Sequence, residues 1–130
     1  MAYSKLHASI VNSSLWTEPD AVRLLFVTLL ALADKDGMVY GSKNGISRLA
    51  NIDPDESDSA WVALMSPDPD SSDTTRAPEH EGRRIEAIGG GFRLLNFQYY
   101  RDLRSDDDRR EQNREAQARF RAKKAQEIQR

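Results

Sequence analysis

Charged side chains give this sequence its clearest capacity for chemistry, and they are distributed unevenly along the chain. Residues 1–82 carry 6 Lys or Arg against 13 Asp or Glu, a net charge of −7. Residues 83–130 carry 13 Lys or Arg against 8 Asp or Glu, a net charge of +5. A basic stretch attached to an acidic body indicates a tail that interacts with a partner.

Residue arrangements typical of catalysis do not occur. Ser, His and Asp are present, but they form neither a nucleophile elbow nor a paired-carboxylate constellation. The run Gly89-Gly90-Gly91 lacks the Lys-Ser/Thr that completes a phosphate-binding loop, so we interpret it as a turn. His80 lies among acidic residues, where we favour a solvated loop over a metal site. There are no cysteines. We therefore predict no enzyme, no cofactor and no metal.

The most specific pattern lies in the tail, between Asn113 and Lys124. Its spacing Asn-x-x-Ala-Gln-x-x-Phe-Arg, from Asn113 to Arg121, resembles the basic region of fungal-type bZIP regulators. In that family a continuous helix lies in the major groove of DNA. The leucine heptad that forms the dimer in that family does not follow here. The resemblance therefore implies neither dimerisation nor a palindromic site.

The resemblance assigns roles to the tail residues. It implies that Asn113 and Gln117 reach base edges, while Ala116 and Phe120 make apolar contacts in the same groove. Arg121 would contact a phosphate or a guanine. The remaining basic residues would neutralise phosphates: Arg109, Arg110, Arg114, Lys123 and Lys124. The alternative is a plain solvated helix, against which like-charged pairs four residues apart argue.

A composition change after Leu103 separates this tail from the body. Residues 105–108 are a helix-start signal, and residues 109–130 contain no Gly or Pro and many good helix formers. Almost none of these residues is apolar, so we expect a helix that is frayed or disordered until it meets a partner. The predicted division is a domain over residues 1–103 and a basic helical tail over residues 104–130.

The body begins with its surest element, a helix over residues 21–33 that is apolar almost all round. Such a helix belongs at the centre of a core. Thr17 or Ser14 is the expected cap, and Gly37 ends the segment because it tolerates positive φ. Residues 38–40 form a short strand candidate.

Two further helices follow. Ser42 is expected to cap a helix over residues 44–50. Its predicted apolar face is Ile46, Leu49 and Ala50. Asp53 followed by Pro54 is a strong start for a third helix, which ends near Met65. Its predicted buried residues are Ala60, Trp61 and Leu64.

A hairpin completes the body. Residues 66–82 have loop composition. Residues 83–88 and 92–97 are strand candidates on either side of the glycine run. The order helix, strand, helix, helix, hairpin predicts an α+β fold of the winged helix-turn-helix type, with the hairpin as the wing. The aromatic residues expected in its core are Trp16, Trp61, Phe26, Phe92 and Phe97.

Several blocks of residues 1–103 resemble phage and prophage winged-helix proteins, namely the N-terminal domains of replication initiators or replisome organisers. The blocks are Tyr3–Leu6, Ser13–Trp16, Leu29–Gly37, Pro67–Ser71, Glu81–Ile85 and Asn96–Arg101. The resemblance implies binding to double-stranded DNA during phage DNA replication, followed by recruitment of replication proteins such as the helicase machinery. It also implies a place in the cytoplasm of a bacterial host.

The third helix does not suit a DNA groove. It would be the recognition helix, yet it contains acidic residues and no Lys or Arg, so phosphates would repel it. Either this helix stays out of the groove or it faces a protein. The candidate DNA contacts of the body are therefore on the second helix and the wing: Lys43, Arg48, Arg83, Arg84 and Arg93. Ordinary surface charge is the alternative interpretation for each.

The sequence thus predicts a DNA-binding protein that acts in phage or prophage replication through its wing and basic tail. A phage transcriptional regulator would use the same contacts. A protein-interaction adaptor, whose acidic third helix binds a basic partner, is the other alternative. We expect no membrane partner, because no apolar run approaches the roughly 18 residues that a spanning helix needs, and no secretory signal, because the first residues lack a basic and apolar stretch.

Overall fold

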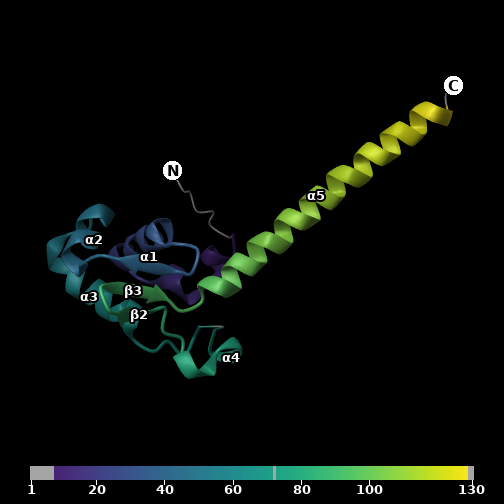
Figure 1. Cartoon of the computed structure of the whole chain (residues 1–130). Coiled ribbons are helices and arrows are strands. Elements are labelled where there is room, and N and C mark those ends of the chain that lie inside the picture. Colours follow the sequence, from purple (N-terminus) through teal and green to yellow (C-terminus); the bar gives the residue numbers. More distant parts are fainter. Residues whose placement is uncertain (1–7, 72, 129–130) are drawn as a thin grey trace. The chain divides into compact units, whose positions relative to one another are not determined.

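The structure combines helices with one small antiparallel sheet, so the α+β class predicted from the sequence is confirmed (Figure 1). The computed structural model describes residues 8–71 and 73–128. In chain order, the elements are η1 (Ala8–Asn12), η2 (Ser14–Thr17), α1 (Asp20–Leu32), β1 (Met38–Tyr40), α2 (Lys43–Ala50), α3 (Pro54–Met65), α4 (Asp73–Arg76), η3 (Pro78–His80), β2 (Ile85–Ile88), β3 (Gly91–Leu94) and α5 (Phe97–Ile128). The chain divides into two units, one ending at Gln98 and the other beginning at Tyr99.

Helix α1 is the centre of the core in the first unit. Its buried residues are Ala21, Val22, Leu25 and Leu29. They pack against α2 and α3, as expected for a helix that is apolar on most sides. The predicted cap is wrong, because Pro19 is the N-cap and the first turn closes by a backbone bond from the Val22 N–H to the Pro19 carbonyl, 3.0 Å long. Thr17 instead donates its hydroxyl to the Ser14 carbonyl.

Helices α2 and α3 begin at the caps that the sequence predicts. The Ser42 hydroxyl accepts a hydrogen bond from the Gly45 N–H at 3.1 Å. The Asp53 carboxylate accepts one from the Asp55 N–H at 2.9 Å. Pro54 follows in the first turn, where its missing N–H leaves no bond unmade. Each such cap contributes about 1 kcal/mol to helix stability.

A buried hydroxyl joins α2 to α3. The Trp61 indole N–H donates to the Ser47 hydroxyl at 2.9 Å, and the hydroxyls of Ser47 and Ser57 lie 2.8 Å apart. Since Ser47 occupies the inward position, Leu49 points to solvent and is 67% exposed, so its predicted burial is wrong. The residues predicted to be buried on α3 are confirmed: Ala60, Trp61 and Leu64.

The strands form an antiparallel sheet in the order β1-β3-β2, and the predicted hairpin of β2 and β3 is confirmed. Gly90 turns the hairpin with a φ of +82°. On β3, a Cβ at Gly91 would lie 2.0 Å from the Val39 carbonyl oxygen, so only glycine lets β1 approach. The neighbouring Phe92 ring lies with its centroid 4.5 Å from that of Trp61. This contact ties the sheet to the helices.

The segment 66–82, predicted as a loop, contains the short elements α4 and η3. A carboxylate anchors α4, because Asp73 is 6% exposed and accepts hydrogen bonds from Arg76 and from the Asn96 side-chain amide. The composition of the segment could not predict this helical turn, since the contact that holds it comes from residue 96.

A buried polar network ties the same segment to β2. The Arg84 guanidinium, 8% exposed, donates to an Asp68 carboxylate oxygen at 2.9 Å and to the Ser14 hydroxyl at 2.7 Å. The Ser14 hydroxyl donates in turn to the same Asp68 oxygen at 2.7 Å. Three distant parts of the chain are therefore held together by one ion pair and its hydrogen bonds.

Asp68 makes the stability of the first unit depend on pH. Burial alone would raise the pKa of Asp68, but hydrogen bonds from Ser14, the Asp70 N–H and Arg84, together with the charge of Arg84, lower it below the ordinary 3.8. A carboxyl whose folded pKa is depressed adds stability above its unfolded pKa, and this stability is lost as pH falls through the folded pKa. We expect the free energy of unfolding to decrease as pH falls below about 4.

Urea unfolding from about pH 5 to pH 2 measures this decrease. The variant Asp68→Asn, which cannot ionise, is expected to be less stable at neutral pH and to lose less stability on acidification. An equal loss in the parent protein and in the variant would show that Asp68 does not carry the dependence.

Helix α5 begins at Phe97, earlier than the sequence predicts. The second hairpin strand ends at Leu94, and Phe97 packs against the core from the first turn of α5. No Gly or Pro interrupts the 32 residues of α5. Every side chain from residue 105 to residue 128 is exposed. In the described ranges, 8–71 and 73–128, no helix has both the length and the apolar character needed to cross a membrane.

Candidate nucleic-acid interface

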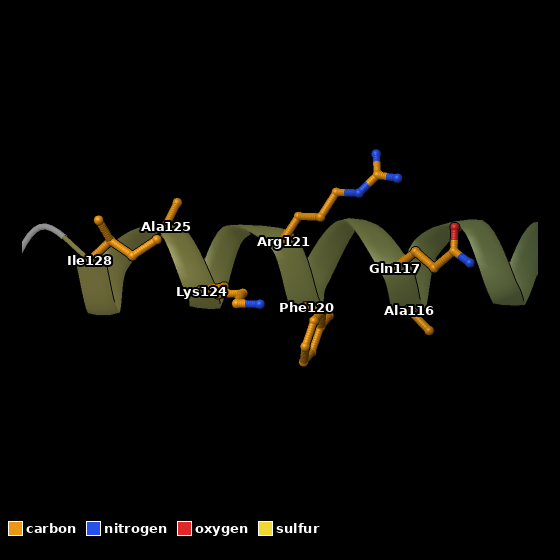
Figure 2. Close-up of a pocket in the computed structure, with 7 residues that line it drawn as sticks. All are labelled: Ala116, Gln117, Phe120, Arg121, Lys124, Ala125 and Ile128. Carbon is orange, nitrogen blue, oxygen red and sulfur yellow. The ribbon is translucent and has the colours of Figure 1, made fainter.

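Four residues of the tail lie on one face of α5. Asn113, Gln117, Phe120 and Lys124 are separated by four, three and four positions, the spacing that brings side chains onto one side of a helix. Figure 2 shows the side chains that line a shallow hollow along this side. The hollow is lined by Ala116, Gln117, Phe120, Arg121, Lys124, Ala125 and Ile128.

An exposed aromatic ring lies within this face. Phe120 is 64% exposed, and the Lys124 ammonium lies 5.8 Å from the centroid of its ring. The Phe120 ring and the Arg121 side chain both line the hollow, and they extend to opposite sides of the helix in Figure 2. Removing a Phe side chain from water contributes about 1.5–3 kcal/mol to binding. This face can therefore combine apolar contact with cationic contacts.

The preceding part of α5 holds its arginines in ion pairs three residues apart. Nitrogen and oxygen atoms are 3.7 Å apart in Arg109–Asp106, 4.0 Å apart in Arg110–Asp107 and 4.0 Å apart in Arg114–Glu111. These side chains are all more than half exposed, and exposed pairs of this kind contribute about 0–1 kcal/mol to stability. The pairs are therefore weak enough to open when a stronger anion approaches.

The opposite face of α5 has a different character. The helical period places Glu111 and Glu115 there, followed by Ala118 and Ala122. Glu111 and Glu115 therefore lie away from Gln117 and Phe120, whereas Glu127 falls near the candidate face, three residues after Lys124. A plain solvated helix does not require Glu111 and Glu115 to be separated from this face.

Basic residues of the first unit differ in how accessible they are to a phosphate. Lys43 and Arg48 are exposed at the two ends of α2. Arg83 is partly buried, and its Nε donates to the His80 carbonyl at 3.1 Å. Arg93 on β3 pairs with Glu86 opposite it on β2, while its side chain stays 43% exposed. These four residues remain candidates for contact with phosphates.

Arg84 does not fit the DNA-contacting role predicted for it. Its guanidinium is buried and bonded to Asp68 and Ser14, so a phosphate could reach it only if this network broke. The sequence shows Arg83 and Arg84 as equivalent neighbours. The alternation of side chains entering β2 separates them, since Arg84 lies on the inner side with its acidic partner.

Helix α3 presents acidic residues to solvent. Asp55, Glu56 and Asp58 are exposed, and Val62 on the same helix is 60% exposed. An exposed stripe of carboxylates repels phosphates. The exposure of these carboxylates agrees with the expectation that α3 is unsuited to a DNA groove.

Two aromatic residues are more exposed than a core position allows, one of them predicted to be buried and the other not singled out from the sequence. Trp16, expected in the core, is 39% exposed, and the Arg23 guanidinium carbon lies 5.2 Å from its ring centroid. Tyr40 is 67% exposed at the end of β1, close to Gly90 of the hairpin turn. The strand pattern could have identified Tyr40, because Val39 points inward and the next side chain must point outward.

No group of three His, Asp or Glu side chains gathers to hold a metal ion within the described residues. No protein-family model, no curated protein and no solved structure matches this chain.

Proposed function

We propose that this chain binds double-stranded DNA, with α5 as the principal contact. The observation that carries the proposal is the single face of α5 on which Asn113, Gln117, Phe120 and Lys124 lie. Cations capture the DNA by releasing its condensed counterions. The amide side chains of Asn113 and Gln117 are suited to hydrogen bonds with base edges in the major groove, where Phe120 supplies apolar contact.

We also propose that the first unit is a winged-helix domain with a supporting role in DNA binding. The order α1, β1, α2, α3, β2, β3 and the pairing of β1 with the hairpin support this proposal. Lys43, Arg48, Arg83 and Arg93 are its candidate phosphate contacts. A role in phage or prophage replication, in the cytoplasm of a bacterial host, rests on the resemblance of the sequence blocks.

Truncation after Leu103 tests the proposal. The shortened chain keeps the whole first unit and loses the candidate face of α5. We expect its affinity for a labelled DNA duplex to fall at least about tenfold at low salt, a loss of about 1.4 kcal/mol. Fluorescence anisotropy over a salt series measures the affinity, and the plot of log K against log salt is expected to become flatter.

The control is a double variant of the full-length chain. A variant with Asn113→Ala and Gln117→Ala keeps every cation, so its salt dependence should stay unchanged while its preference among duplex sequences decreases. If the full chain binds no duplex at low salt, the proposed function is wrong.

A protein-interaction adaptor is the second candidate, favoured by the exposed carboxylates of α3 and by Val62 beside them. It differs in its expected result, because weak DNA binding would then survive the truncation unchanged. Asp55→Asn with Asp58→Asn would in that case abolish binding of the basic protein partner.

A further inference from the structure

Charge is divided along α5 as well as around it. The proximal segment, residues 106–115, contains five carboxylates and three arginines, a net charge of −2. The distal segment, residues 116–128, contains four basic residues and one carboxylate, a net charge of +3. The sequence pattern treats the basic residues of both segments as equivalent phosphate contacts, but a phosphate would meet opposite local charges in the two segments.

The ion pairs follow the same division. All three arginines of the proximal segment have a carboxylate within 4.0 Å on the preceding turn. In the distal segment, no carboxylate of the described residues pairs with the basic residues Arg119, Arg121, Lys123 and Lys124. Lys124 contacts the Phe120 ring instead, which leaves its positive charge in place.

We infer that the distal segment makes the phosphate contacts of α5 and that the carboxylates of the proximal segment limit its affinity for DNA. This inference rests on the proposed function and restricts the phosphate contacts of α5 to residues 116–128. A phosphate that approaches Arg109 or Arg110 must displace Asp106 or Asp107, and the displaced carboxylate stays on the same helix and repels it. Within the described residues no carboxylate is paired with Arg121 or Lys124, so a phosphate that approaches them has no ion pair to displace.

Matched pairs of variants in the full chain test the inference. Arg109→Gln with Arg110→Gln removes two proximal charges, and Arg121→Gln with Lys124→Gln removes two distal charges. Glutamine forms helices about as well as Arg and Lys, so α5 keeps its helical preference. Each lost phosphate contact flattens the salt dependence by about 0.9, so we expect a change of about 1.8 for the distal pair and less than half of that for the proximal pair.

A second pair of variants removes carboxylates of the proximal segment, which should raise the affinity for DNA. Asp106→Asn with Asp107→Asn is expected to raise the affinity for duplex DNA about threefold at low salt, as the loss of two weak competing interactions permits. The control is Asp55→Asn with Asp58→Asn, which changes the net charge equally but acts on α3. It should change the affinity less than the α5 pair does.

The outcomes separate the inference from the proposed function. Suppose that the parent chain binds duplex DNA and that the proximal and distal double variants flatten the salt dependence equally. The inference is then wrong and the proposed function stands. The same holds if the α3 control raises affinity as much as the α5 variant, because net charge alone would then explain both. If the parent chain binds no duplex at low salt, the proposed function fails before any variant is compared.

Discussion

Trp61→Ala is expected to lower the free energy of unfolding by about 3–5 kcal/mol, the usual cost of truncating a large buried aromatic side chain. Trp61 is 1% exposed, packs against Phe92 and donates its indole N–H to Ser47. Alanine would leave a cavity between α3 and the sheet and would remove one of the two hydrogen-bond partners of the buried Ser47 hydroxyl. Urea denaturation followed by circular dichroism measures the change.

Two control variants separate the causes of this loss. Trp61→Phe keeps most of the apolar contact and removes the hydrogen bond, so we expect a smaller cost, of about 1–3 kcal/mol. Val62→Ala on the same helix changes a side chain that is 60% exposed and should cost less than about 0.5 kcal/mol. A cost for Trp61→Ala no larger than that for Val62→Ala would contradict the placement of Trp61 in the core.

Arg84→Met is expected to lower the free energy of unfolding by about 3 kcal/mol, because it removes one partner of a buried ion pair and leaves the other without compensation. Both partners are well shielded, with side chains 8% and 16% exposed for Arg84 and Asp68. Methionine has nearly the same length as the aliphatic part of arginine, so little packing is lost. Chemical denaturation at neutral pH measures the effect.

A double variant tests whether the pair explains the loss. Asp68→Asn added to Arg84→Met removes the unpaired charge, so the two changes together should cost less than the sum of the single costs. Under conditions where Arg84→Met remains folded, its affinity for duplex DNA should equal that of the parent chain. A lower affinity would support the direct phosphate contact that the sequence suggests for Arg84.

Local features of the fold could be predicted from the sequence because neighbouring residues create them. Ser42 and Asp53 cap their helices through bonds that reach only two or three residues along the chain. The glycine run turns a hairpin for the same reason, since Gly90 needs its positive φ whatever surrounds it. These elements, together with the buried face of α3, agree with the sequence.

Features decided by distant residues could not be predicted. Ser47, and not Leu49, occupies the inward face of α2, because the Trp61 indole N–H, 14 residues away, donates to its hydroxyl. Arg84 differs from Arg83 because Asp68 and Ser14 are brought to it by folding. For the candidate site, the resemblance predicted that Asn113, Gln117 and Phe120 face one groove, which agrees with their shared face on α5. It could not predict the ion pairs of the proximal segment, and the contact with DNA stays a prediction.

The position of β1 in the sheet has a consequence for how the protein is made. Val39 pairs with Phe92, 53 residues later, and within the part of the chain that the structure describes β1 pairs with no strand other than β3. While the ribosome is still synthesising the chain, α1, α2 and α3 can pack together, but β1 keeps unpaired backbone groups until β3 has emerged. Closing so large a loop is slow compared with forming local helices. The growing chain therefore exposes a strand edge until β3 has been synthesised, and a short edge of three residues limits the risk of aggregation during that interval.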